Sequence, residues 1–320
     1  MKPKLPELDF GSVRFSSLKD RPSKVNLTDF AKPLVPGGSF AGFVDGLSDI
    51  LAAKDIKDAA ASLARAAKDG RTVMLAMGGH PIKVGLGPVI CQLLRGDLVS
   101  SISGNGAIMV HDTEVALTGA TSEDVAAGLG KGDFGVTRET GEIIAMAINR
   151  AAESREGLGR ALGQTLIDLK APNLSVSVLA TAVMAGKPVT VHVAIGNDVY
   201  HIHPACDGAN LGAATMDDFK TFCRIVATLG QGAFINLGSA VIMPEVFLKA
   251  LTLTRNMGFA VDGLTTINMD FIKQYRPSVN VVERPTKGSG RGYTLIGHHE
   301  IMFPLLMGMA MEKLAAMGET

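Results

Sequence analysis

A chain of 320 residues with 31 basic and 31 acidic side chains has a formal net charge of zero, which argues against nucleic acid or an anionic membrane as its partner. It is long enough to bury a large core, and its three cysteines lie far apart without metal-type spacing, which favours reduced thiols in the cytoplasm. The N-terminus lacks the apolar stretch of a signal peptide, and no window reaches the roughly 18 apolar residues of a membrane span, so we expect a soluble protein.

The first 70 residues contain a proline-rich segment followed by helical patterns. Residues 1–38 lack a clean helical or alternating pattern, so we expect an arm that lies over the body of the protein or over a partner subunit. Apolar residues then recur at helical spacing in residues 40–51 and 56–68. We predict an N-terminal arm over residues 1–38 and a single α/β domain over residues 39–320.

Two short apolar runs that end in glycine turns flank a predicted helix. Val73–Met77 stops at Gly78-Gly79, residues 98–103 stop at Gly104-Asn105-Gly106, and residues 88–95 between them have helical spacing after a proline. This order predicts a strand, a helix and a parallel strand. In such sheets ligands bind beyond the carboxyl ends of the strands, where glycine lets backbone N–H groups approach phosphate.

Downstream of this unit the pattern is helical, with one glycine-rich interruption. Helices are expected at residues 108–117, 121–125, 142–153 and 158–169. The interruption, residues 128–141, is either a lid over a ligand or a surface excursion. Residues 175–184 form either a helix or a buried strand, because periodicity alone does not separate the two.

The second half of the chain alternates between strand and helix patterns. Strands are predicted at residues 189–196, in a short run from Val199, within residues 232–241 and at residues 259–267. Helices are predicted at residues 217–229, at residues 244–257 and from about His298 onward, after a flexible segment at residues 287–292. The alternation predicts an α/β fold with one doubly wound, mostly parallel sheet.

Three stretches, in the same order, resemble deoxyhypusine synthases. They are MLAMGGHPIKVGLGPVICQLLRGDLVSSISGNGA with the following HDTEVAL, then HPACDGANLG, and then FINLGSAVIMPEVFLKAL. The resemblance covers roughly residues 70–270 and implies that family's NAD-binding fold. Active sites that form between subunits in that family imply a homo-oligomer, a dimer or tetramer, with sites near the subunit interface.

The chain departs from the family at positions that carry its reaction. By this resemblance the family's catalytic lysine falls at Met243, and a thioether cannot form the imine that the lysine forms. An acid that helps the family bind a polyamine falls at Ala213, and the family's active-site indole has no counterpart because the chain has no Trp. These departures argue against polyamine transfer to a protein lysine.

The glycine turns and the resemblance together predict NAD as the cofactor. The expected contacts are Gly78, Gly79, His80, Gly85, Asn105, Gly106, Ala107, Gly238, Ser239, Thr265, Thr266 and Asn268. The last three match the place where the family binds the ribose of the nucleotide. No GxGxxG fingerprint with a distant acid is present, and each glycine taken alone is compatible with a simple turn.

The histidines supply the acid–base candidates, because imidazole titrates near neutral pH. His201 and His203 lie two apart on a predicted strand and should face the same side, with His203 leading into Asp207. His111 and Glu114 lie just after the second glycine turn. We therefore assign His203, Asp207, His111 and Glu114 as candidate catalytic residues; each imidazole is also compatible with a partly buried structural role.

Several weaker interpretations stay open. His201 and His203 with a distant carboxylate are compatible with zinc, although no HExxH or CxxC motif supports a metal. Cys206 is compatible with a nucleophile or a small buried residue, and Lys83 and Lys249 with imine chemistry if burial lowers their pKa. Residues 287–292 are compatible with an anion-binding loop or a solvated one. His298, His299 and Glu300 suit a helix start.

The sequence therefore predicts an NAD-dependent enzyme that acts on a small amine or amino acid by reversible hydride removal. His203 or His111 would move the proton, and Asp207 or Glu114 would hold the substrate ammonium. A cyclodeaminase that retains NAD is one version, because cyclisation uses the substrate's own amine. The alternative is a catalytically silent nucleotide-binding or assembly protein of the same fold.

Overall fold

The computed structural model describes residues 3–318, and the chain divides into two compact units between Ala53 and Lys54. The first unit has two short 3-10 turns, η1 (Phe10–Ser12) and η2 (Leu27–Asp29), before helix α1 (Phe40–Gly46). Ser39 caps α1 by accepting a hydrogen bond from the N–H of Gly42. Large apolar side chains in the residues before α1 stay exposed, among them Phe15 at 92%.

The second unit is built on a six-stranded sheet. Its strands are β1 (Val73–Met77), β2 (Ser101–Asn105), β3 (Val189–His192), β4 (Ala233–Leu237), β5 (Thr265–Asp270) and β6 (Arg291–Ile296). Every strand pairing in the described residues is parallel, in the order β3-β2-β1-β4-β5-β6. The strand order reverses between β1 and β4, and such a reversal opens a crevice at the carboxyl ends. The predicted doubly wound sheet is confirmed.

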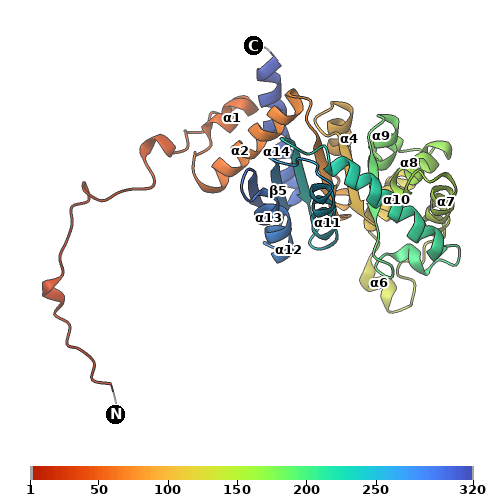
Figure 1. Cartoon of the computed structure of the whole chain (residues 1–320), viewed down its shortest axis with the longest axis horizontal. Helices are drawn as coiled ribbons and strands as arrows, with labels where there is room; N and C mark the ends of the chain where they lie inside the picture. Colours follow the sequence, from red (N-terminus) through yellow and green to blue (C-terminus); the bar gives the residue numbers. More distant parts are fainter. Residues whose placement is uncertain (1–2, 319–320) are drawn as a thin grey trace. The chain divides into compact units, whose positions relative to one another are not determined.

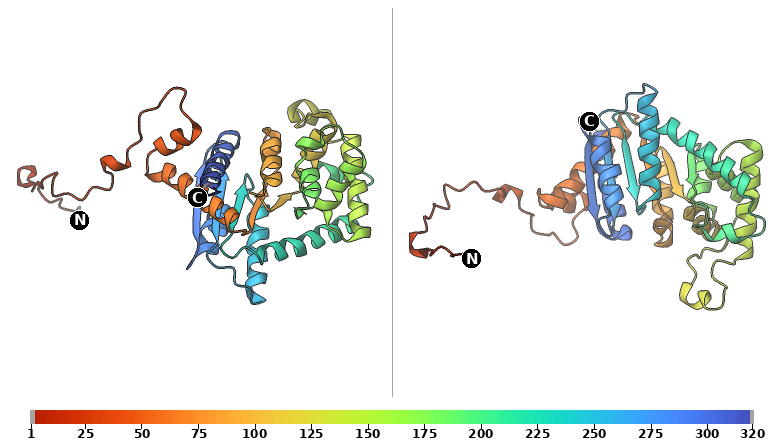
Figure 2. Two further views of the ribbon diagram at one scale, coloured as in Figure 1. Left: turned by 90° about the horizontal axis from the view of Figure 1, so that it is seen from above. Right: turned by 60° about the horizontal axis from the view of Figure 1, so that its bottom comes forward.

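Helices cover both faces of this sheet (Figure 1). The helices from α2 onward are α2 (Leu51–Lys68), α3 (His80–Lys83), α4 (Gly87–Arg95), α5 (Ala107–Thr118), α6 (Val125–Leu129), α7 (Arg138–Ser154), α8 (Leu158–Asp168), α9 (Val178–Met184), α10 (Gly208–Val226), α11 (Ile242–Asn256), α12 (Tyr275–Pro277), α13 (Arg284–Thr286) and α14 (His299–Gly318), of which α6 projects away from the sheet in Figure 1. In the left view of Figure 2, α4 and α14 lie on one face, and α10 and α11 lie on the other.

The central strand β1 is buried on both faces, as its unbroken apolar run predicts for a parallel sheet. Met74 belongs to an apolar cluster that includes Phe222 of α10 and Phe247 of α11. Phe247 stacks on Phe234 of β4, with ring centroids 3.8 Å apart. This packing holds α10 and α11 against β1 and β4.

Asp112, a fully buried carboxylate on α5, organises the start of α9. Its Oδ1 accepts from the N–H of Val178, and its Oδ2 accepts from the N–H of Leu179 and from the hydroxyl of Ser177. The hydroxyl of Ser177 in turn accepts from the N–H of Ala180 and caps the helix. This cap makes residues 178–184 a helix, the choice that periodicity left open.

Asp218 of α10 is a second buried carboxylate, and it joins two elements. Its Oδ2 accepts from the N–H groups of Gly159 and Val191, at 2.9 and 2.7 Å, and its Oδ1 has no hydrogen-bond partner in the described residues. Burial is the main reason that the pKa of Asp218 is raised to about 8. Asp218 thereby ties β3 to the start of α8.

We expect the free energy of unfolding to depend on pH through the carboxyl group of Asp218. The folded chain holds the proton of Asp218 more tightly than the unfolded chain, so the resulting stabilisation is present below pH 3.8 and is lost as the pH rises through about 8. Asp218→Asn, which keeps an acceptor and cannot ionise, should flatten the fall of the urea midpoint between about pH 4 and pH 8. Asp218→Leu should lower stability at every pH by about 2–5 kcal/mol, since both N–H groups lose their acceptor. An unchanged slope in Asp218→Asn would contradict the assignment.

Several predicted boundaries are wrong. The last long strand is β5 at Thr265–Asp270 instead of residues 259–267, and β6 begins at Arg291, inside the segment predicted to be flexible. The run from Val199 is a 3-10 helix, η4 (Val199–Ile202), because Asp198 and His201 form a capping box around it. His201 and His203 therefore do not share a strand face.

Helix α14 meets the length and hydropathy of a membrane span, although the sequence was expected to contain no such segment. Its 18-residue window has a mean hydropathy of 1.3, and 28% of that window is buried inside the protein. Phe303, Leu306 and Met307 are buried, as in a helix that packs on a sheet. Length and composition alone do not separate such a core helix from a membrane span.

Candidate functional site

The turns after β1 and β4 meet at the reversal of strand order. A Cβ at Gly78 would lie 2.4 Å from the carbonyl oxygen of Gly238 and 3.9 Å from Nδ2 of Asn105, so the three residues lie together. Gly238 has a φ of +64°, in the left-handed region that favours glycine. The close approach explains why glycine is needed here, and it places three predicted cofactor residues at one edge.

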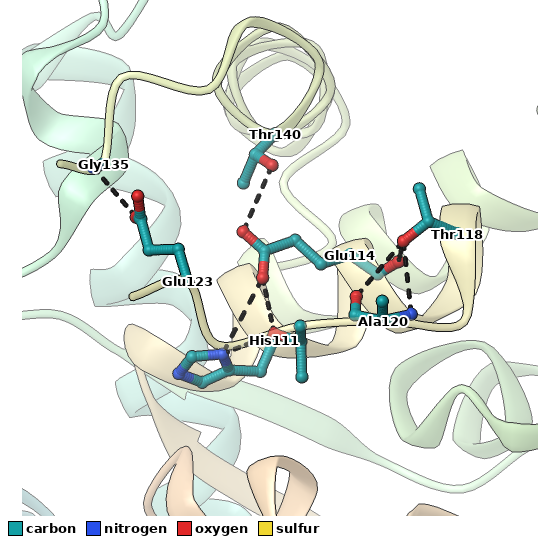
Figure 3. Close-up of polar contacts among 8 residues, drawn as sticks. His111, Glu114, Thr118, Ala120, Glu123, Gly135 and Thr140 are labelled. Carbon is teal, nitrogen blue, oxygen red and sulfur yellow. Dashed lines mark hydrogen bonds and ion pairs between the residues drawn. The ribbon is translucent and has the colours of Figure 1, made fainter. Parts of the chain in front are cut away.

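His111, Thr121 and Glu114 form a hydrogen-bonded chain beside this edge (Figure 3). The Thr121 hydroxyl donates to Oε2 of Glu114 at 2.5 Å and lies 2.8 Å from Nδ1 of His111. The Thr140 hydroxyl donates to the other carboxylate oxygen of Glu114 at 3.4 Å. Both ends of the Glu114 carboxylate are therefore fixed by threonines.

The direction of these bonds assigns the tautomer of His111. Since Thr121 donates its one hydroxyl proton to Glu114, it must accept from Nδ1–H of His111, which leaves the lone pair on Nε2. Burial, and next the charge of Lys83, lower the pKa of His111 to about 4. The ring lies against Gly79, whose Cβ would come within 2.7 Å of His111 Cδ2. An uncharged base thus lies at the turn after β1.

Replacing Lys83 with Met should raise the pKa of His111 from about 4 toward its ordinary value of 6.5, because a cation beside the ring disfavours its protonated form. An NMR titration of the His111 ring proton measures this directly. Lys249→Met is the matched control, since Lys249 pairs with Glu245 on α11 and is no cause of the His111 shift. An equal shift in both variants, or none in Lys83→Met, would contradict the assignment.

Three cavities meet at Glu114 and Glu123. One of about 560 Å³ also contacts Arg138 and His203, one of about 220 Å³ contacts Lys83 and His111, and one of about 490 Å³ has a more apolar lining. Glu123 is held by the glycine-rich segment, because its Oε1 accepts from the N–H of Gly135 at 2.9 Å. The two carboxylates therefore form the shared wall of the three cavities.

The two remaining catalytic candidates have different surroundings. His203 lines the cavity of about 560 Å³, and its ring packs so closely on α7 that a Cβ at Gly141 would lie 2.4 Å from His203 Cδ2. Nδ1 of His203 accepts from the N–H of Ala205, which puts the proton of the neutral ring on Nε2. Asp207 is exposed and caps α10 by accepting from the N–H of Asn210. Asp207 thus has a structural partner and lines none of the three cavities.

Most of the predicted cofactor residues lie at or just after the carboxyl ends of β1, β2, β4 and β5. They are Gly78, Gly79, His80, Asn105, Gly106, Ala107, Gly238, Ser239 and Asn268. Gly85 lies between α3 and α4 with a φ of +80° and no contact at its Cβ position. Thr265 and Thr266 begin β5, so the expectation that they end a strand is wrong. They lie toward the opposite edge of the sheet because the strand starts later than predicted.

Asp198 occupies the space over the second glycine turn. A Cβ at Gly106 would lie 1.9 Å from Oδ2 of Asp198, which sits over the start of α5. Burial is the main reason that the pKa of Asp198 is raised. Sequence reasoning missed this residue because the loop after β3 shows no pattern that brings it beside β2.

His299 is a second residue whose setting the sequence did not reveal. It is 1% exposed, its Nε2 lies 3.7 Å from Oδ1 of Asp270, and its ring centroid lies 5.2 Å from that of His80. A Cβ at Gly238 would lie 2.8 Å from its Cε1. The sequence predicted only a helix start at His298 and His299. It did not predict the burial of His299, because β6, the strand that leads into this helix, was not recognised.

Two of the weaker interpretations lose their basis in the geometry. Nδ1 of His201 accepts from the N–H groups of Asp198 and Gly196, so this nitrogen holds the loop after β3. Within residues 3–318 no group of three His, Cys, Asp or Glu side chains is arranged to hold a metal ion. Burial, and then the charge of Asp207, raise the pKa of Cys206, which disfavours a nucleophilic thiolate.

The fold is shared with solved structures of low sequence identity. No protein-family profile and no curated protein matches the chain. ArgZ, an arginine dihydrolase from the ornithine-ammonia cycle in cyanobacteria, has 17% identity and a TM-score of 0.51 over 80% of this chain and 31% of its own. A mutant of AgrE with bound L-arginine has 16% identity and a TM-score of 0.51 over 83% of this chain and 33% of its own.

A third similar structure is a candidate deoxyhypusine synthase from Entamoeba histolytica. It has 12% identity and a TM-score of 0.50, over 88% of this chain and 96% of its own. The chain thus spans about a third of the length of the ArgZ and AgrE proteins and nearly all of the third. At these identities the similarity shows a common α/β fold.

Proposed function

We propose that the chain is an NAD-dependent enzyme that oxidises the carbon–nitrogen bond of a small amine or amino acid. The observation that supports this most is the position of His111, an uncharged base whose ring lies against Gly79 at the reversal of strand order. ArgZ is an arginine dihydrolase and the AgrE mutant binds L-arginine, which favours an amine-bearing substrate on this fold. The free thiols of Cys91, Cys206 and Cys223 in this chain suit the cytoplasm.

The residues around the smaller cavity suit one half of a dinucleotide. Lys83 offers positive charge for a phosphate, and the buried carboxylate of Asp198 suits a ribose diol. The same carboxylate over Gly106 would repel a phosphate at that glycine, so we assign the phosphate to the Lys83 side of the cavity. The reversal of strand order beside this cavity is where this class of sheet binds nucleotides.

The side chains can carry the proton chemistry of such a reaction. When bound, the nicotinamide supplies the acceptor for the hydride that leaves carbon. Nε2 of His111 takes the proton that the substrate ammonium must lose before the hydride departs, and the carbon–nitrogen bond becomes an iminium. Glu114, held by Thr121 and Thr140, attracts the ammonium toward His111. Glu123, from the shared wall, adds a second negative charge.

Equilibrium binding and hydride exchange test the proposal in two steps. Calorimetric titration with NAD should show saturable binding, and Asp198→Ala should weaken it while Asp207→Ala, on the exposed cap of α10, should not. Deuterium transfer from a labelled amine to bound NAD would then identify an enzyme. Binding without transfer would favour a catalytically silent nucleotide-binding protein, and absence of binding would refute the NAD proposal.

A further inference from the structure

We propose that the cavity of about 560 Å³ recognises the carboxylate of an α-amino acid, with His203 and Arg138 as its partners and with Glu114 and Glu123 holding the ammonium. The inference rests on the proposed function. It narrows the substrate from a small amine or amino acid to an amino acid. Both signs of charge line one cavity of about 560 Å³, which also contains Thr137 and Thr140. A plain amine would leave the positive side of this cavity without a partner.

His203 is built as a hydrogen-bond donor. Because the N–H of Ala205 donates to Nδ1, the ring proton of neutral His203 lies on Nε2, and a protonated ring would also donate from Nε2. His111 has the opposite tautomer, with its lone pair on Nε2 and its Nδ1–H directed at Thr121. The two histidines therefore have different roles. His111 accepts a proton, and His203 donates a hydrogen bond to an anion.

Arg138 adds a permanent positive charge beside His203. It opens α7, a 17-residue helix whose cap residue, Thr137, makes no side-chain cap hydrogen bond. Both residues line the cavity, together with Gly141 on the next turn of the helix, against which the ring of His203 packs. An arginine, an N–H donor and the positive end of a helix thus face one volume, a combination that suits a carboxylate.

The negative side of the cavity is equally fixed. Glu114 is held by the hydroxyls of Thr121 and Thr140, and Glu123 by the N–H of Gly135. Glu114 also lines the smaller cavity with His111, so an ammonium drawn to Glu114 lies between the carboxylate-binding side and the base. The arrangement orients an α-amino acid with its nitrogen toward His111.

A matched pair of ligands tests the inference: L-lysine, and cadaverine, which is lysine without its carboxylate. Calorimetric titration of the full chain should give tighter binding of lysine by about 10–100-fold, the worth of charge-assisted hydrogen bonds to one carboxylate. In His203→Ala and Arg138→Gln the ratio of lysine affinity to cadaverine affinity should fall toward one, while cadaverine affinity stays unchanged. Arg138→Lys, which keeps the charge, should retain part of the preference.

Gly141→Ala provides a variant that leaves both donors in the chain. Its new methyl would lie 2.4 Å from His203 Cδ2 and displace the ring, so the preference for lysine should again fall. Circular dichroism of each variant confirms that it is folded. Equal binding of the two ligands by the unaltered chain, or no lysine binding at millimolar concentration, overturns the inference. NAD binding, measured on the same samples, separates this failure from a failure of the proposed function.

Discussion

His111→Ala should lower kcat/KM for amine oxidation by about 10²–10⁴-fold, the usual contribution of a positioned general base. The variant removes the uncharged imidazole of His111, which lines the smaller cavity and contacts Gly79. NAD affinity should change little, because His111 contributes no charge at neutral pH. Stopped-flow measurement of reduced nicotinamide absorbance under single-turnover conditions measures the chemical step itself.

The pH profile gives an independent signature of the same group. Because its pKa is lowered to about 4, His111 keeps its lone pair at neutral pH and loses it only as the pH falls through about 4. The acid limb of kcat/KM should lie there and should move to higher pH in Lys83→Met. Thr121→Val is the matched control for positioning: it frees Nδ1 without removing the base, so a smaller loss of rate is expected. An active His111→Ala enzyme with an unshifted acid limb would show that another group is the base.

Asp112→Ala should destabilise the fold by about 3–5 kcal/mol, the largest stability effect that we expect from one polar substitution. Three donors converge on the buried Asp112 carboxylate, two of them N–H groups at the start of α9, and none can reach water once the carboxylate is gone. Chemical denaturation at neutral pH measures the free energy of unfolding directly.

Two milder variants show that the loss comes from these hydrogen bonds. Ser177→Ala removes one donor and the cap of α9, so a loss of about 1 kcal/mol is expected. Asp112→Asn turns one acceptor into a donor that faces an N–H or a hydroxyl. Its loss of stability should lie between those of Ser177→Ala and Asp112→Ala. If Asp112→Ala unfolds at the same denaturant concentration as the unaltered chain, the cap does not hold α9.

The order of strand, helix and strand in residues 73–107 was readable from the sequence because each apolar run there is followed by glycines, although β2 runs on through Gly104 and Asn105, which were expected to form the turn. The same reasoning failed at Val199, where β-branched and aromatic residues favour a strand but the Asp198 and His201 cap imposes a 3-10 turn. It also failed at β6, since glycine and arginine in residues 290–292 hid a strand that pairs with β5.

The candidate site was only partly predictable. His111 and Glu114 were identified because they follow a glycine turn, and their spacing places them on one side of α5. Thr121, Asp198 and Arg138 were not identified as partners, because each comes from a loop or helix end whose position depends on tertiary packing. The tautomer of His111 depends on two hydrogen bonds of Thr121 and that of His203 on one from Ala205, and no sequence pattern encodes them.

The connection from β2 to β3 bears on how the chain folds. Ser103 and Thr190 are hydrogen-bonded neighbours in adjacent strands, although they lie 87 residues apart in the chain. Closing so long a loop is entropically costly, so contacts of this kind slow folding and form late. The β3 edge cannot assemble during synthesis until helices α5 to α9 have left the ribosome, and until then the β2 edge stays open to wrong partners.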